Sequence, residues 1–259
     1  MTFKADLFKL IKLKTTYICM ILTIIFSSIT VISSYKANSY MALGLQNALG
    51  TNCVHITSMK NIIFQMMHST DLIIMFLIIM CSVFWISEFD IGTIKLQIMN
   101  TKSRFKLLLS KYLTILFTST LLYFLYLVTS VVTGLFFFKL EPIVDIAQTF
   151  KICIFQLVML SLIISIVMLL SLLIRHKTIL ITLLFIYPII SGILLMIASQ
   201  VLDEKTVNFL VNSEPLTLFT TFGINEIFIV QPYRIIFIAL LSILFIGIST
   251  IKFKNIEVR

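Results

Sequence analysis

Charged residues are scarce in this sequence, and that scarcity narrows the class of protein. Asp, Glu, Lys and Arg together make up 12% of the 259 residues, whereas hydrophobic residues make up 59%. The mean hydropathy is +1.10. A soluble domain usually has about a quarter of its residues charged. The composition therefore excludes an ordinary soluble domain and predicts a protein with much of its surface in lipid.

Cysteine and histidine are also sparse, and their spacing argues against two kinds of site. The four cysteines form no Cys-x-x-Cys pair, three of them lie inside apolar runs, and the three histidines are dispersed. Structural zinc needs Cys or His ligands at short spacings, and a disulfide framework needs paired cysteines. We therefore expect no metal site and no disulfide among Cys19, Cys53, Cys81, Cys153, His55, His68 and His176.

Catalytic groups are missing at membrane depth. No Asp, Glu, Lys, Arg or His lies in the middle of any long apolar run. Proton- and ion-coupled carriers usually place such groups near the bilayer midplane. The seven glycines are isolated, so the phosphate loop G-x-x-x-x-G-K-[ST] is missing as well. The sequence predicts a protein that is not an enzyme, binds no cofactor directly and, if it transports, takes its energy from a partner.

The sequence does contain six long apolar runs, at about 15–35, 71–88, 112–138, 152–174, 178–202 and 234–251. A hydrocarbon core about 30 Å thick needs about 20 residues in helical form. The runs are continuously apolar, whereas barrel strands alternate. The first run is too long for a signal-peptide core, and no convincing cleavage site follows it. We therefore predict an all-α integral membrane protein, with residues 1–259 as one transmembrane domain of six spans.

The basic residues flank these runs and predict the orientation. The formal net charge is +9, but its placement along the edges of apolar runs fits membrane flanks better than a nucleic-acid surface. Of the 20 Lys and Arg residues, 14 fall at the two ends and in the second and fourth connections. Because positive residues gather on the cytoplasmic side, we predict both termini in the cytoplasm. The abundance of Ile, Lys and Asn favours the cell membrane of a bacterium with an AT-rich genome.

Three segments outside the runs differ in pattern. Residues 2–14 place apolar side chains on one helical stripe and lysines over much of the rest, which predicts an elbow helix lying on the cytoplasmic leaflet. Residues 205–233 alternate apolar pieces with breakers such as Pro215 and Gly223, so we expect short external helices there. Residues 36–70 form a long external connection whose pattern favours no particular structure.

The connection between the second and third runs, residues 88–111, is the most informative. Glu88 stands where the second run meets the cytoplasm, and Gly92 permits a change of chain direction. Residues 91–99 then form a short apolar element, and the polar residues 100–103 predict a turn before the next helix. The pattern predicts a short cytoplasmic helix between two spans, suited to transmit a push from a docked partner. From the pattern alone, the alternative is an ordinary basic loop.

This segment resembles the signature of type 2 ABC exporter permeases. It carries Glu-x-x-x-Gly-Thr-Ile-Lys, then a short apolar stretch, then Ser-Arg and later Ser-Lys. The proline that usually precedes Ser-Arg is replaced by Thr101-Lys102. The resemblance covers the whole chain, since that family has an elbow helix, six spans, cytoplasmic termini and short external helices between spans 5 and 6. The residues that carry the motif are Glu88, Gly92, Thr93, Ile94, Lys95, Ser103, Arg104, Leu108, Ser110 and Lys111.

The resemblance implies a division of labour with other subunits. In that family the short helix inserts into a cleft of a cytosolic ABC ATPase, which binds the ATP and Mg. Two ATPase subunits and a second permease chain, either a second copy or a sister subunit, would complete the transporter. The residues expected to couple this chain to the ATPase are Glu88, Gly92, Thr93, Lys95, Arg104 and Lys111.

The resemblance also implies a translocation path, because spans 2 and 5 line it in that family. A path built of Phe, Met and Ile suits an amphipathic or hydrophobic cargo. We expect peptides, in toxin export, antimicrobial-peptide export or immunity. The alternatives are export of drugs or lipid-linked glycans, and a stand-alone membrane protein that sequesters an antimicrobial peptide. The candidate path residues, each of which could instead face lipid or pack between helices, are Met75, Phe76, Met80, Phe84 and Phe185.

Overall fold

The computed structural model describes residues 2–49, 71–90, 92–100, 103–137, 146–174, 176–203, 206 and 232–254. Within these residues all regular secondary structure is helical, which confirms the all-α prediction. Five of the helices are long and apolar enough to cross a membrane. The protein is therefore membrane-embedded in character, with a fold built from long helices.

The helices follow one another in a simple order. They are α1 (Thr2–Lys12), α2 (Lys14–Leu49), α4 (Asp71–Asp90), α5 (Thr93–Asn100), α6 (Arg104–Phe137), α7 (Ile146–Ile174), α8 (Lys177–Val201) and α11 (Pro232–Lys254). The five candidate spans lie within α2, α4, α6, α7 and α11. In α8 the apolar stretch Lys177–Tyr187 is shorter.

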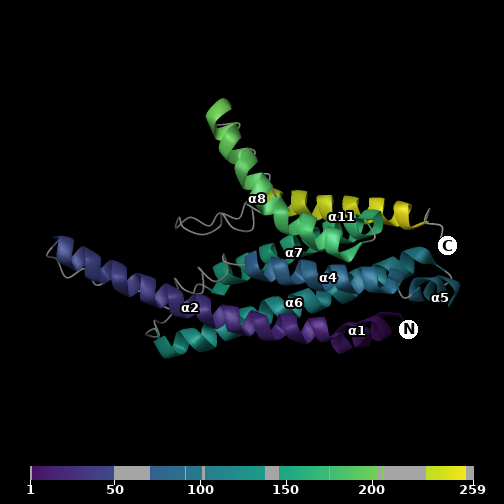
Figure 1. Ribbon diagram of the computed structural model, residues 1–259, viewed down its shortest axis with the longest axis horizontal. Helices are drawn as coiled ribbons and strands as arrows, with labels where there is room; N and C mark the ends of the chain where they lie inside the picture. Colours follow the sequence, from purple (N-terminus) through teal and green to yellow (C-terminus); the bar gives the residue numbers. More distant parts are fainter. Residues whose placement is uncertain are drawn as a thin grey trace.

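The long helices lie side by side in an elongated bundle (Figure 1). Helix α7 packs against α4, α6, α8 and α11, and α2 packs against α6 and α4. Helix α1, helix α5 and the C-terminal end of α11 all lie at the same end of the bundle, at the right of Figure 1. We call this end the α5 end.

Helices α2 and α6 extend furthest beyond the apolar runs that predict them, which are at about 15–35 and 112–138. Helix α2 has 36 residues and α6 has 34. At 1.5 Å per residue these are about 54 Å and about 51 Å long, so both extend beyond a hydrocarbon core of about 30 Å. Helix α6 starts at Arg104, directly after the polar residues 100–103 that predict its beginning, so Lys111 lies inside a helix. The break after the elbow helix falls at Leu13, and the predicted external segment 205–233 lies almost entirely outside the described residues.

Many serine and threonine side chains find hydrogen-bond partners for their hydroxyl groups inside the bundle, although Ser82 Oγ is buried without one among the described residues. Most donate to a carbonyl three or four residues earlier, as Thr118 Oγ1 does to Thr114 O at 2.7 Å. Others join helices: Ser27 Oγ of α2 lies 2.8 Å from Ser130 Oγ of α6. Close hydroxyl pairs of this kind hold helices together where lipid supplies no hydrophobic driving force. These bonds give the hydroxyl groups partners within and between helices.

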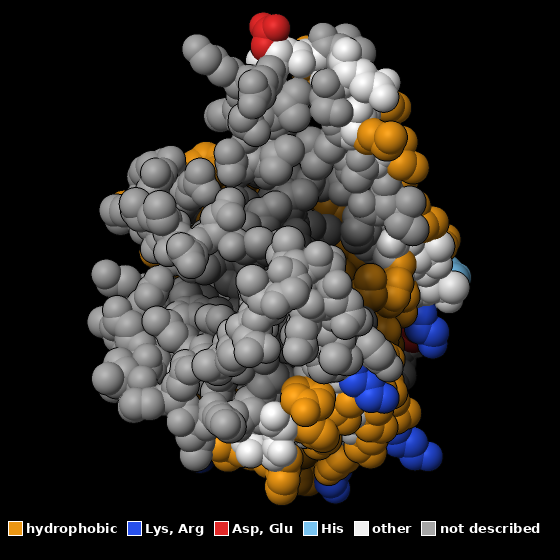
Figure 2. All heavy atoms as spheres, turned by 90° about the vertical axis from the view of Figure 1, so that its left-hand side faces the viewer, with side chains coloured by type: hydrophobic (Ala, Val, Ile, Leu, Met, Phe, Trp, Pro, Cys, Tyr) orange, Lys and Arg blue, Asp and Glu red, His pale blue; other side chains and the backbone are white. Residues whose placement is uncertain are grey.

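The apolar surface divides into a buried core and an outer face. The largest fully buried side chains include Trp85, Tyr123, Tyr126 and Phe155. Large apolar side chains remain exposed along α2, α6, α8 and α11. Figure 2 looks at the end opposite to the α5 end, and hydrophobic side chains make up most of the described surface visible there. This distribution is the one expected for a bundle surrounded by lipid.

Candidate functional site

A turn at Gly92 separates α4 from α5. Gly92 has φ of +73°, in the left-handed region that glycine adopts without strain, and its N–H donates to Phe89 O at 3.1 Å. Thr93 Oγ1 donates to Glu88 O at 3.3 Å. Both bonds satisfy carbonyls in the last turn of α4, which would otherwise have no helical partner. The turn therefore ends α4 and starts α5 within three residues of Asp90.

Helix α5 has one face against the bundle and one face outside. Ile94 is 1% exposed, whereas Leu96 is 63% exposed and Met99 is 82% exposed. With eight residues, α5 is too short to form a stable helix on its own. Contacts with α4 and α6 hold it in place. The result is a short helix that projects two large apolar side chains from the α5 end.

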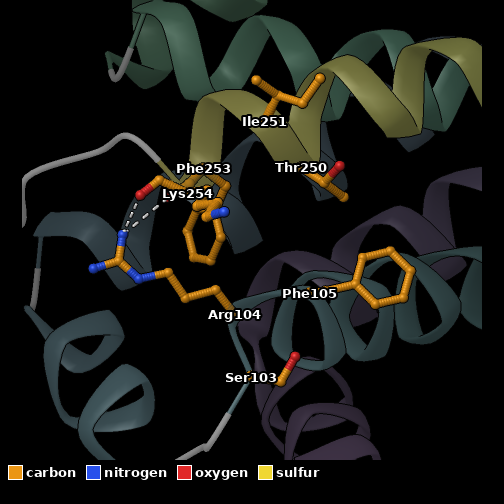
Figure 3. A pocket seen from close by; sticks show the side chains of 7 residues that line it. All are labelled: Ser103, Arg104, Phe105, Thr250, Ile251, Phe253 and Lys254. Carbon is orange, nitrogen blue, oxygen red and sulfur yellow. Dashed lines mark hydrogen bonds between the residues drawn. The ribbon is translucent and has the colours of Figure 1, made fainter.

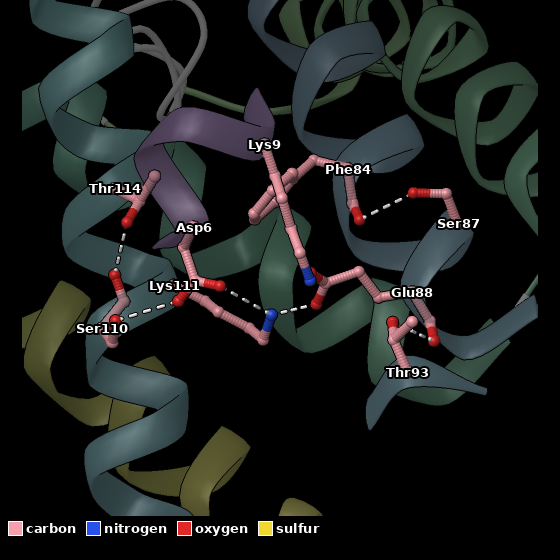
Figure 4. A network of polar contacts seen from close by, with 9 residues as sticks. All are labelled: Asp6, Lys9, Phe84, Ser87, Glu88, Thr93, Ser110, Lys111 and Thr114. Carbon is pink, nitrogen blue, oxygen red and sulfur yellow. Dashed lines mark hydrogen bonds and ion pairs between the residues drawn. The ribbon is translucent and has the colours of Figure 1, made fainter. Parts of the chain in front are cut away.

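A cluster of charged side chains lies beside this helix, where α1, α4 and α6 meet (Figure 4). Lys111 of α6 is 0% exposed, and its Nζ contacts the carboxylates of Glu88 in α4 and, at 3.6 Å, Asp6 in α1. Ser110 Oγ donates to Asp6 Oδ2 at 3.0 Å. Lys9 Nζ lies 3.6 Å from Glu88 Oε1. We call Asp6, Lys9, Glu88, Ser110 and Lys111 the polar cluster.

The polar cluster is balanced in charge, with two carboxylates facing two ammonium groups. Asp6 is 2% exposed and Glu88 is 5% exposed, so each depends on its partners for stabilisation. Burial raises the pKa of the Asp6 carboxyl above its ordinary value, although Lys111 acts in the opposite direction. Removing one partner of a buried ion pair costs about 3–5 kcal/mol, because the other charge is left without compensation. The cluster therefore joins three helices firmly at one point.

Arg104 makes a different connection. Its Nη1 donates to Lys254 O at 2.6 Å and to Phe253 O at 3.4 Å, both in the last turn of α11 (Figure 3). A cation at the C-terminal end of a helix satisfies open carbonyls and offsets their partial negative charge. Arg104 therefore ties the first residue of α6 to the end of α11.

The structure brings the predicted coupling residues together at the α5 end but in two groups. Glu88, Thr93 and Lys111 meet near the turn at Gly92. Arg104 contacts α11 instead. The side chain of Lys95 lies outside the described part of the chain. That these residues couple to an ATPase stays a prediction.

The predicted path residues lie mostly in the core of this chain. Phe76, Met80 and Phe84 are 8%, 1% and 1% exposed, and Phe76 packs on Phe26 of α2 with ring centroids 5.8 Å apart. Met75 and Phe185 are partly exposed. In this arrangement Phe76, Met80 and Phe84 are packed inside the bundle. Their role in a translocation path stays a prediction.

Two residues of the polar cluster, Asp6 and Lys9, were not singled out from the sequence. Asp6 is the sole acidic residue before position 71, in a segment otherwise rich in lysine. That isolation is a signal that its carboxylate has a specific partner. The partner itself is 105 positions away in sequence, at Lys111, so no local pattern predicts the pairing. Among the described residues no group of three or more His, Cys, Asp or Glu side chains could hold a metal ion.

Comparison with known proteins places the chain in a family without assigning it an activity. Residues 15–259 match the family DUF2705, described as a protein of unknown function. The chain therefore belongs to this family. No curated protein matches the chain.

Proposed function

We propose that this chain is the membrane-spanning subunit of an ATP-driven exporter, with ATP hydrolysed by a separate ABC ATPase. The observation that carries the proposal is helix α5, which projects Leu96 and Met99 from the bundle and is bonded through Thr93 to the backbone of Glu88, beside the polar cluster. A docking element that transmits movement needs exposed apolar anchors and a firm attachment. This helix has both.

The layout of the helices supports six crossings. Helices α2, α4, α6, α7 and α11 supply five candidate spans. The contacts of Asp6 with Lys111 and of Arg104 with Lys254 place α1, the start of α6 and the end of α11 at the same end of the bundle. A chain whose two ends lie on the same side crosses an even number of times, so α8 serves as the sixth span. In our proposal the α5 end faces the cytoplasm of a bacterial cell.

The contacts at the α5 end give a route for force. A push on α5 reaches α4 through the turn at Gly92, and it reaches α1 and α6 through the polar cluster. Arg104 extends the route from α6 to α11. Movement of an attached ATPase therefore acts on α1, α4, α6 and α11 together. In this proposal Glu88 and Lys111 position the helices and need not touch the ATPase.

The assembly comprises two such chains, as a homodimer or with a sister subunit, and two ATPase subunits. The cargo is amphipathic or hydrophobic, and peptides in toxin export or antimicrobial-peptide immunity fit best, because the interior of the chain is built from Phe, Met, Ile and Leu. For Phe76, Met80 and Phe84 to contact cargo, α4 must move away from α2 during transport.

Co-purification of this chain from its native membrane, followed by identification of any bound ABC ATPase, tests the proposal. The variant Leu96→Ser/Met99→Ser is expected to lose the ATPase, because it removes both exposed anchors. Phe136→Ser is the matched control, since Phe136 is 81% exposed at the other end of α6 and Met99 is 82% exposed. The control is expected to retain the ATPase. If no ATPase co-purifies with the wild type, or if both variants retain it, the exporter proposal fails and a stand-alone membrane protein is favoured.

A further inference from the structure

A cavity of about 590 Å³ opens between the start of α6 and the end of α11, at the α5 end. It is lined by Ser103, Arg104, Phe105, Thr250, Ile251, Phe253 and Lys254 (Figure 3). Its volume falls within the range of about 300–1,000 Å³ typical of small-molecule sites. None of these residues belongs to the polar cluster, so the cavity is a separate feature.

The lining combines positive charge, hydroxyl groups and apolar walls. Arg104 and Lys254 supply the charge, and the described lining contains no acidic residue. Ser103 Oγ accepts a hydrogen bond from Lys106 N–H at 3.5 Å, and a serine that accepts such a bond can still donate its own hydrogen. Phe105 is 53% exposed and Ile251 is 66% exposed. The cavity therefore offers donors and cations for an anion next to surface that suits a hydrocarbon chain.

The partial negative charge at the end of α11 does not oppose an anion here. The carbonyls of Phe253 and Lys254 already accept hydrogen bonds from Arg104 Nη1. A guanidinium on these carbonyls offsets the charge of the helix end. The charge that an incoming anion meets is then set by Lys254, which is exposed.

We propose that this cavity binds the headgroup of an anionic phospholipid, with its phosphate near Lys254 and Ser103 and its acyl chains along Phe105 and Ile251. Basic pockets between spans at a membrane surface are the usual sites for such headgroups. The last turn of α11 and the first turn of α6 lie at the ends of two candidate spans, where basic residues flank the apolar stretches. The bound lipid bridges α6 and α11 beside the contact that Arg104 already makes. This site does not depend on the exporter proposal.

Native mass spectrometry of the full chain in detergent, titrated with phosphatidylglycerol or phosphatidylcholine, tests the site. The wild type is expected to bind phosphatidylglycerol in preference to phosphatidylcholine. Lys254→Gln is expected to weaken phosphatidylglycerol binding about fivefold, the effect of one basic residue at a membrane surface. Lys254→Arg keeps the charge and is expected to bind like the wild type. Lys252→Gln is the matched control, because Lys252 lies on the same helix and is exposed but does not line the cavity.

The same titration separates a lipid from a soluble phosphate. Glycerol phosphate has the headgroup chemistry without acyl chains, so it is expected to compete poorly with phosphatidylglycerol. Phe105→Ser is expected to weaken the binding of phosphatidylglycerol and to leave the binding of glycerol phosphate unchanged. Equal losses in Lys252→Gln and Lys254→Gln would show diffuse attraction to a basic surface and overturn the site. Competition by glycerol phosphate as strong as that of the lipid would overturn the lipid assignment.

Discussion

Replacing Lys111 by Met tests whether the polar cluster holds the α5 end together. Met matches the lysine side chain as far as Cε but lacks the ammonium group, so Asp6 and Glu88 lose the cation that contacts both of them. The two carboxyls are 2% and 5% exposed, and water cannot replace the lost partner without opening the cluster. Leaving a buried charge uncompensated costs about 3–5 kcal/mol, so we expect a loss of this size in the free energy of unfolding.

The measurement is unfolding by SDS in mixed micelles, followed by the fluorescence of the single tryptophan, Trp85. The Trp85 ring lies 5.9 Å from Lys111 Nζ, so it reports on the cluster directly. Lys106→Met is the matched control, because Lys106 lies on the same helix and is exposed. It should cost less than about 1 kcal/mol. Glu88→Gln/Lys111→Met should cost less than the sum of the single changes, since the two groups are paired. Equal losses for Lys111→Met and Lys106→Met would refute the reasoning.

Three further outcomes are expected at the same end of the bundle. Gly92→Ala should destabilise the chain by about 1–2 kcal/mol in the same SDS assay, from the positive φ alone, because nothing lies within 4 Å of an added Cβ; no loss would contradict the turn geometry. Because the pKa of Asp6 is raised in the folded state above its ordinary value of 3.8, the folded chain binds this proton more tightly. The protonated Asp6 carboxyl therefore contributes its full stabilisation below pH 3.8, and this stabilisation is lost as the pH rises through the folded pKa. The melting temperature of the wild type should decline over this pH range, and Asp6→Asn should flatten the decline. A decline as steep in Asp6→Asn as in the wild type would contradict the role of Asp6. Arg104→Lys should speed hydrogen exchange in the amides that precede Lys254, because the lysine side chain is one atom shorter and its ammonium does not reach the two carbonyls that Arg104 Nη1 bonds; exchange equal to the wild type would show that this contact is dispensable.

The apolar runs and the turns were open to prediction because local chemistry decides them. A continuous run of Leu, Ile and Phe must form a helix in lipid, where each backbone group needs a partner within its own segment. Gly92 marks the end of α4 for a local reason as well, since few other residues adopt its backbone conformation. The helix lengths were less predictable. The polar residues 100–103 predicted where α6 begins, at Arg104, whereas no such signal predicted that α2 continues to Leu49.

The identity of the site residues could be predicted only in part. Glu88, Thr93 and Lys111 were chosen from a motif, and the structure brings them together. The same motif gave no indication of Asp6, because its contact with Lys111 spans α1 and α6. Nor could it separate Phe76, Met80 and Phe84, which are buried, from the many apolar side chains of the spans that face outward.

The sequence by itself therefore determined the class of protein, the helical content, the turn at Gly92 and the basic character of the α5 end. These properties depend on composition and on neighbours along the chain. Only the tertiary structure decided which charge meets which, that Lys111 is buried between Asp6 and Glu88, and that Arg104 reaches the end of α11. The physical reason is that an ion pair depends on distance in space, and the packing of whole helices sets that distance.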